Sequence, residues 1–253
     1  MKTPKGMSKA EWDARVDLAC AFQLFALFGW TDMIKTHLSV RVPGVENQFL
    51  TNPYGLLFED ITASSLVKVG DKGELLSKSN YSIHPTAIVI HGGIHNAHPA
   101  FGCVLHLHTV AGVAVSMQKN GLLPACQHAL TTLFQVRYHD FEGVASGEAE
   151  RESLLRDLGD GGILILRNHG TLTVGPTVAE AFYRMYRLER ACQYQIAALS
   201  GGAEFYPIPK ADQEKTIEQG RRAYTGEAAK EKSELVWAGL KRKLKREGII
   251  YAI

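Results

Sequence analysis

Apolar side chains recur at helical spacing over several long stretches of the chain. Ser8 and Glu11 form the capping pattern S-x-x-E at the start of the first stretch, in which Trp12 and Ala19 fall on one side, and Gly29 marks its end. The same spacing, bounded by proline, glycine or polar residues, predicts six further helices, at Pro85–Ala97, Thr109–Lys119, Glu148–Leu158, Pro176–Ser200, Ala211–Ala223 and Glu227–Arg246.

Alternating and continuous apolar runs between these helices predict the strands. Polar and apolar residues alternate from Thr36 to Val42, and Pro43-Gly44 turns the chain back into Gln48–Thr51, which predicts a β-hairpin. A further turn is expected around Asp71. Other extended segments are predicted at Gly102–Thr109, Phe134–Tyr138 and Ile163–Gly170. This mixture of helices and strands indicates an α/β fold.

Length and composition narrow the class of protein. A chain of 253 residues with 45% hydrophobic and 21% charged residues is an ordinary globular sequence, and we favour one domain. The net charge of +2 argues against a nucleic-acid partner. The four cysteines are scattered through apolar patterns, which favours buried thiols in a reducing compartment over disulfides. With no signal region and no membrane-length apolar run, we expect a cytoplasmic protein.

Three histidines stand where strands are predicted. His106 and His108 alternate within one strand, so they share a face with Cα atoms about 6.6 Å apart. His169 closes a second buried strand, and Gly170 would let the backbone turn directly after it. Three histidines with an open fourth position are typical of a catalytic zinc or related divalent site. The alternative is three buried histidines satisfied by backbone carbonyls. Arg167 could orient a coordinating ring or lie in solvent.

Four segments, in their order and spacing, resemble the class II aldolase/adducin family. They are His37–Arg41, Leu50–Leu56, His106–Thr109 and Ile165–Gly170. The resemblance implies a three-layer α/β/α sandwich with a central, largely antiparallel sheet, with the core at about residues 10–202 and a helical C-terminal extension at 203–253. It also implies a homotetramer, with active sites between neighbouring subunits, and a divalent metal on His106, His108 and His169.

The sequence departs from the sugar-phosphate aldolases of that family in two places. Their acid/base glutamate falls on Ala87, which cannot move protons. Their phosphate-binding Gly-Asn pair falls on Thr36-His37, and a serine pair falls on Pro85-Thr86. We therefore expect a small acidic substrate without a phosphate, because a phosphate needs several converging donors. The overall likeness is to the adducin-like branch, with the three histidines retained.

Two histidines are candidates for the missing proton transfer. His91 lies one helical turn before His95 and could replace the glutamate, with a packing or solvated role as the alternative. His128 falls where aldolases of the family present a tyrosine to the neighbouring subunit, so it could be a general acid or a surface residue. The candidate substrate-binding residues are His37, Thr36, Asn52, Gly55 and Thr86.

Three functions remain open at this point. The favoured one is a metal-dependent lyase, which cleaves a carbon–carbon bond beside a carbonyl in an aldol-type or decarboxylating reaction, with zinc preferred and manganese or iron as alternatives. A non-heme iron oxygenase would use the same histidines. A non-catalytic, adducin-like assembly protein would need none of this chemistry.

Overall fold

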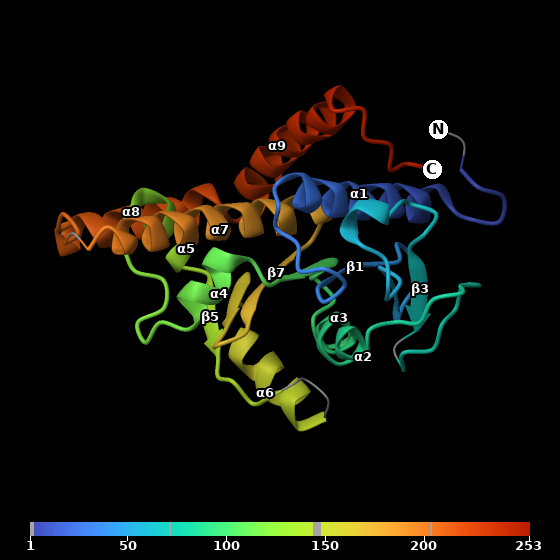
Figure 1. The fold of residues 1–253 in the computed structure, drawn as a ribbon, viewed down its shortest axis with the longest axis horizontal. Coiled ribbons are helices and arrows are strands. Elements are labelled where there is room, and N and C mark those ends of the chain that lie inside the picture. The colour runs from blue at the N-terminus through green and yellow to red at the C-terminus, as the bar shows by residue number, and fades with distance from the viewer. Residues whose placement is uncertain (1–2, 71, 144–147, 203) are drawn as a thin grey trace.

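The computed structural model describes residues 3–70, 72–143, 148–202 and 204–253, so the turn expected at Asp71 lies outside the described residues. Within them a mixed sheet of seven strands has the order β3-β2-β1-β4-β7-β6-β5 (Figure 1). β5 and β6 are parallel, whereas the other neighbouring strands are antiparallel, which confirms the predicted sheet. The strands are β1 (His37–Arg41), β2 (Gln48–Thr51), β3 (Val67–Gly70), β4 (Cys103–Leu107), β5 (Val136–His139), β6 (Ile163–Leu166) and β7 (Gly170–Gly175).

Helices cover both faces of the sheet, as the predicted α/β/α sandwich requires (Figure 1). One face packs against α1 (Lys9–Leu27), α4 (Val110–Ser116) and α7 (Val178–Ser200), and α5 (Gln127–Leu133) and α9 (Gly226–Arg246) pack against α7. The opposite face packs against a second set of helices, which comprises α2 (Pro85–Ala87), the π-helical turn η2 (Ile88–Gly92), α3 (Gly93–Ala97) and α6 (Glu148–Leu158). The remaining helices are the short 3₁₀ turn η1 (Phe58–Asp60) and α8 (Lys210–Ala223), which packs against α5.

Strand β4 shows how alternation divides the two faces. Leu105 and Leu107 belong to the core beneath α1 and α7, whereas Val104 belongs to the core beneath α3 and α6. His106 has the parity of Val104, so it points toward the α2–α3 side of the sheet. His37 of β1 lies directly opposite His106 in the antiparallel register, and Ser39 lies opposite Val104. The sheet therefore presents a polar stripe to the segment that runs from α2 to α3.

The predicted helices form close to their expected limits. Ser8 caps α1 by accepting a hydrogen bond from the backbone N–H of Glu11 at 3.1 Å. The segment Pro85–Ala97 is helical but not a regular α-helix, because a π-helical turn occupies its middle. Such a turn inserts an additional residue and rotates the side chains that follow it, which the spacing of apolar residues does not reveal.

Two elements and one turn differ from the sequence expectation. The region Gln127–Leu133 is the helix α5, and Phe134 ends that helix instead of starting a strand. The predicted strand Ile163–Gly170 ends at Leu166, and a separate strand, β7, begins directly after His169. The turn before it uses Asn168, whose φ is +56°, instead of Gly170. Gly170 serves close packing, because a Cβ atom there would lie 2.5 Å from the carbonyl oxygen of Leu107.

The segment after residue 203 packs against the rest of the chain. Trp237 of α9 lies against Phe182 with ring centroids 5.3 Å apart, and its indole N–H donates to Asp17 at 3.2 Å. The last residues return to the segment after η1, where the N–H of Ala63 donates to the carbonyl of Tyr251 at 2.8 Å. None of the helices in the described ranges combines the length and apolarity that crossing a bilayer requires.

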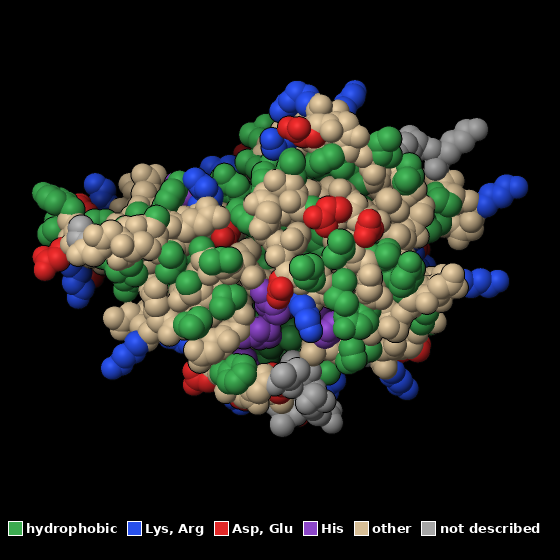
Figure 2. All heavy atoms as spheres, viewed as in Figure 1, with side chains coloured by type: hydrophobic (Ala, Val, Ile, Leu, Met, Phe, Trp, Pro, Cys, Tyr) green, Lys and Arg blue, Asp and Glu red, His purple; other side chains and the backbone are tan. Residues whose placement is uncertain are grey.

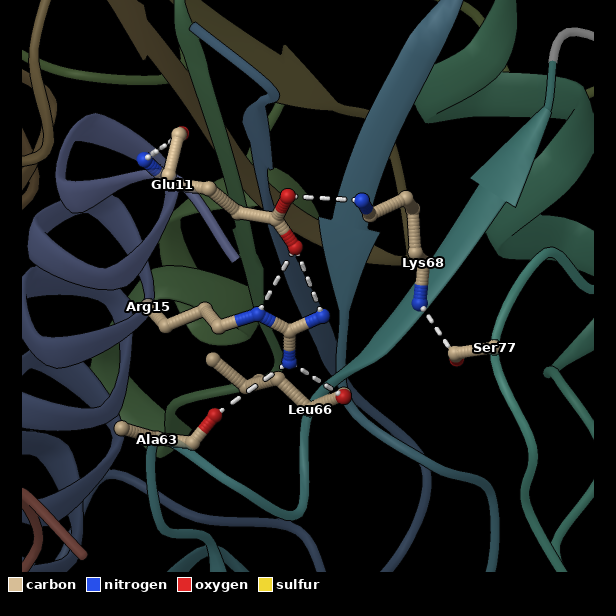
Figure 3. Close-up of polar contacts among 7 residues, drawn as sticks. Glu11, Arg15, Ala63, Leu66, Lys68 and Ser77 are labelled. Carbon is tan, nitrogen blue, oxygen red and sulfur yellow. Dashed lines mark hydrogen bonds and ion pairs between the residues drawn. The ribbon is translucent and has the colours of Figure 1, made fainter. Parts of the chain in front are cut away.

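A buried ion-pair network joins α1 to β3 (Figure 3). The Glu11 carboxylate accepts from Arg15 at 3.1 Å and from Lys68 at 2.6 Å. The Arg15 guanidinium also donates to the carbonyls of Ala63 and Leu66, at 3.3 and 2.7 Å. Burial lowers the pKa of Arg15, and the hydrogen bond and negative charge of Glu11 oppose that effect. The carboxylate is therefore the compensating charge for two cations.

Glu11→Gln should destabilise the protein by about 3–5 kcal/mol, because the substitution leaves buried Arg15 without a counter-charge. The measurement is the free energy of unfolding in urea. Asp13→Asn is the matched control on the same helix, since the Lys9–Asp13 pair is exposed and should contribute less than about 1 kcal/mol. Equal losses in the two variants would contradict the assigned role of Glu11.

Candidate metal centre

Three histidines converge at one end of β4. His106 lies in β4, His108 follows that strand, and His169 lies in the turn between β6 and β7. One ring nitrogen from each of them lies within 4.8 Å of the other two. The Nε2 atoms of His106 and His108 are 2.9 Å apart. His106 is buried, whereas the other two rings are half-buried. The arrangement is a three-nitrogen donor set with access from one side.

The second nitrogen of each strand histidine has an acceptor that fixes its tautomer. His106 Nδ1 donates to the carbonyl of Thr171 at 3.1 Å, and His108 Nδ1 donates to the Asp32 carboxylate at 3.0 Å. In the neutral rings both Nε2 atoms therefore carry lone pairs, and these lone pairs face each other. Such a pair repels unless a cation lies between the nitrogens. A divalent metal fits this donor set, and Asp32 fits the carboxylate that commonly orients a metal-bound histidine.

Burial keeps the surrounding imidazoles neutral. It lowers the pKa of His106 well below the usual value, and the neighbouring histidines His108, His37 and His169 add to that effect. Burial, with His108 and His139 nearby, lowers the pKa of His169 to about 4. Metal binding requires unprotonated imidazole nitrogens. These two ligand candidates are consequently in the binding form at neutral pH.

The donor set opens into a cavity of about 260 Å³. Figure 2 shows histidine side chains at the bottom of a hollow on this face of the molecule. The described residues that line the cavity are Lys35, His37, His84, Thr86, Ile90, His106, His108, Phe141, Gly143 and His169. A larger cleft of about 710 Å³ lies between α1 and the β1–β2 turn and is not lined by any of these histidines. A small molecule therefore has room beside the donor set itself.

The predicted substrate-binding residues fall into two groups. His37 and Thr86 line the cavity, but Thr36, Asn52 and Gly55 are not among the described residues that line it. Asn52 joins β1 to β2, since its side chain donates to the carbonyl of Thr36 and accepts from the N–H of Leu38, both at 3.4 Å. The hydroxyl of Thr36 is buried without a partner among the described residues. Asn52 thus has a structural role at the ends of these strands.

His91 lies beneath the cavity. Its ring is fully buried, with Nε2 bonded to His37 at 2.8 Å and Nδ1 to Ser39 at 2.7 Å. Both nitrogens are occupied, so the ring has no free position for a substrate. His95 is buried in the same cluster and bonds to Ser39 at 2.8 Å. The structure thus gives both histidines an internal position and not a solvated one.

His128 and Arg167 lie away from the donor set. His128 is exposed on α5, with its ring against Tyr194, and it does not line the cavity. The guanidinium of Arg167 lies 4.2 Å from the ring centroid of Tyr138 and donates to the carbonyl of Gln118 at 2.8 Å. Arg167 therefore stacks on Tyr138 and binds the Gln118 carbonyl instead of orienting a ligand ring. Sequence reasoning missed Asp32 and His84, because no periodic pattern marks them.

The comparisons with known proteins agree with this geometry. The family model described as Class II Aldolase and Adducin N-terminal domain matches residues 16–196. A Caulobacter vibrioides protein, provisionally named an aldolase class 2 protein, is 49% identical over 97% of this chain and 94% of its own. Rat α-adducin is 40% identical over 76% of this chain, which corresponds to 26% of that longer protein.

Solved structures show the same fold. An aldolase II superfamily protein from Pseudomonas syringae superposes with a TM-score of 0.92 at 44% identity, covering 98% of both chains. The L-fuculose 1-phosphate aldolase of Glaciozyma antarctica superposes with a TM-score of 0.80 at 25% identity, covering 97% of this chain and 96% of its own. Both neighbours span essentially the whole chain, including the helices that follow residue 203.

Asp32→Ala should weaken binding of a divalent metal about tenfold or more, because His108 loses the acceptor that fixes its tautomer. The measurement is the dissociation constant for zinc in competition with a chelator. Asp13→Ala, an exposed carboxylate on α1, is the control and should leave the constant unchanged. An unaltered affinity in Asp32→Ala would exclude this orienting role.

Proposed function

The chain belongs to the class II aldolase and adducin family, and on that premise we propose that it is a metal-dependent lyase acting on a small, acidic, non-phosphorylated hydroxy-carbonyl substrate. The observation that carries the proposal is the convergence of His106, His108 and His169 on one point at the edge of a cavity. In this proposal these three rings hold the metal. Zinc is the favoured ion because three imidazoles with an open position suit it.

A bound metal would supply Lewis-acid stabilisation of the oxygen that becomes negative as the carbon–carbon bond breaks. The chain's own residues supply the rest. The half-buried cavity holds the substrate beside the donor set and reduces its contact with water. Lys35, an exposed residue at the cavity, places a positive charge where a carboxylate could bind. Aldol-type and decarboxylating cleavage both need these features.

The local structure supports a substrate without a phosphate. Thr36 is buried, and its position does not offer the open glycine backbone that a phosphate loop uses. Pro85 is the first residue of α2 and has no N–H to donate. A carboxylate demands fewer donors than a phosphate. The similarity to a fuculose 1-phosphate aldolase therefore supports the reaction class and not that substrate.

We expect the zinc-loaded protein to cleave hydroxy-keto acids and to leave fuculose- and ribulose-type phosphates largely unchanged. The assay compares both classes at equal concentration and metal loading, and His108→Ala should lose both metal and activity. Efficient turnover of the phosphates, at a kcat/KM of about 10⁴ M⁻¹s⁻¹ or more, would overturn the substrate assignment. Iron in the purified protein with oxygen consumption would favour the oxygenase, and a protein without bound metal would favour the adducin-like assembly role.

We also propose a homotetramer with the active site at a subunit interface. Two apolar side chains beside site residues in the sequence are exposed: Met33, next to Asp32, at 73%, and Val110, two residues after His108, at 87%. Exposed apolar groups clustered near a site are typical of an interface. In this arrangement His128 would enter the neighbouring subunit's cavity. Partial burial, with Arg187 and Arg190 nearby, lowers its pKa and favours the neutral ring. The scattered cysteines support a reducing, cytoplasmic location.

Light scattering at micromolar concentration should give four times the mass of the 27.8 kDa chain. Val110→Lys should weaken the assembly and lower activity in parallel, because it places a charge in the proposed apolar interface. Lys119→Glu, which changes a charge in the loop after α4, serves as the control. A monomeric wild-type protein would exclude the tetramer.

A further inference from the structure

Among the described residues that line the cavity, one histidine besides the three ligand candidates has a ring nitrogen without a hydrogen-bond partner. His37 and Thr86 both line the cavity, but their side-chain atoms are already engaged in hydrogen bonds. His84 also lines it, and only its Nδ1 is bonded, to the Thr86 hydroxyl at 2.6 Å. Among the described residues no group bonds to His84 Nε2. This atom is therefore available to a molecule in the cavity.

His84 stands at the end of a hydrogen-bonded chain that runs into the protein. Thr86 bonds to His37 at 3.1 Å, and His37 bonds to His91 at 2.8 Å. His91 then bonds to the Ser39 hydroxyl at 2.7 Å. That hydroxyl also bonds to His95 at 2.8 Å, and His95 Nδ1 reaches the carbonyl of Phe101 at 3.3 Å. The chain thus joins a half-buried histidine of the cavity to a backbone carbonyl.

The Phe101 carbonyl fixes the proton positions in the inner half of this series of hydrogen bonds. A carbonyl oxygen can only accept, so His95 Nδ1 donates to it and His95 Nε2 accepts a proton from Ser39. The single hydroxyl hydrogen of Ser39 is then used, so Ser39 must accept from His91 Nδ1–H. His91 Nε2 in turn accepts from His37 Nδ1–H. Each neutral ring has one N–H, which makes every step depend on the one before.

The proton positions of the residues nearer the cavity follow from the same limit of one hydrogen for each neutral ring or hydroxyl. His37 Nε2 has no proton, so it accepts from the Thr86 hydroxyl. Thr86 must then accept from His84 Nδ1–H. His84 Nε2 is left with a lone pair, on a ring that lines the cavity. Burial lowers the pKa of His84, and the nearby Lys35 and His108 add to that effect, so the neutral form predominates at pH 7.

We propose that His84 is the proton-transferring residue of the lyase reaction, and that Thr86, His37, His91, Ser39 and His95 are positioning residues that hold its Nε2 unprotonated. The inference rests on the proposed function and deepens it at the same site. His84 would be the base in a protein that has Ala87 at the position of the family's glutamate. This assignment also gives His91 an indirect role in place of direct catalysis.

The step balances as an ordinary aldol cleavage. His84 Nε2 takes the proton of the substrate's β-hydroxyl, and the oxygen's electron pair forms the carbonyl of the released aldehyde. The carbon–carbon bond breaks, and its electrons remain on the second fragment as an enolate. The His84 imidazolium then returns the proton to the enolate carbon. No oxidant, reductant or further reactant is consumed.

Neutron diffraction from crystals of the deuterated, zinc-loaded wild-type protein tests the tautomers without reference to activity. The expected result is deuterium on Nδ1 and none on Nε2 in His84, His37, His91 and His95. Deuterium on Nε2 of His84 in the neutral ring would overturn the inference, whatever the protein catalyses.

Kinetics test the catalytic role. His84→Gln should lower kcat about 100-fold or more with metal content unchanged, because a general base contributes about 10²–10⁴-fold. His98→Gln is the matched control, since His98 lies on the same segment outside the chain of hydrogen bonds. Thr86→Val breaks the chain beside His84 and should lower kcat at least about tenfold with little change in KM, whereas Thr86→Ser should restore it.

The outcomes separate this inference from the lyase proposal. A wild-type protein that turns over none of the substrates contradicts the proposed function, while the neutron map still decides the proton positions. An active wild-type protein whose His84→Gln variant keeps full activity and full metal content contradicts the role of His84 and leaves the lyase proposal standing.

Discussion

The structure depends on a stripe of buried polar side chains on one face of the sheet. His37, Ser39 and His106 lie on the face that also carries Val104, and they are all buried. Buried polar groups are costly unless each finds a partner. Here every ring nitrogen of His37 and His91 is bonded, and so is the second nitrogen of His106. The Nε2 atom of His106 has no protein donor and instead faces the Nε2 atom of His108 at 2.9 Å.

The sequence could predict the parts of this arrangement that follow from periodicity. Alternation places His106 and His108 on one face, and helical spacing locates α1, α6 and α7. It missed β7 because the preceding strand was extended to Gly170, although the alternation from Thr171 to Val174 is itself a strand pattern. Helix α5 was missed since Pro124 and the polar residues after it resemble a loop. Tertiary packing decides both elements.

Side-chain contacts between segments far apart in the sequence could not be predicted from periodicity either. Asp32 precedes His108 by 76 positions, and no spacing rule links a carboxylate to a ring so far away. Thr36 was expected at the substrate because the glycine of the family's phosphate loop falls there, and Asn52 and Gly55 because their own loop has a glycine that allows close backbone approach. In this chain the phosphate loop has lost its glycine, and Asn52 instead holds β1 and β2 together. A family pattern transfers a fold more securely than it transfers the role of each residue.

The π-helical turn explains how one serine can organise the stripe. A π turn widens the helix, and it occurs here between Ile88 and Gly92, where His91 projects onto Ser39. His95, one turn later, reaches the same hydroxyl oxygen. A hydroxyl has one hydrogen, so contact with two imidazoles forces one bond to be donated and the other accepted. An apolar residue at position 39 would break this order and leave two buried rings unsatisfied. The π-helical turn and Ser39 therefore fix the direction in which each hydrogen bond is donated along the series of histidines. This fixed direction distinguishes an ordered series of hydrogen bonds from a cluster of buried polar residues.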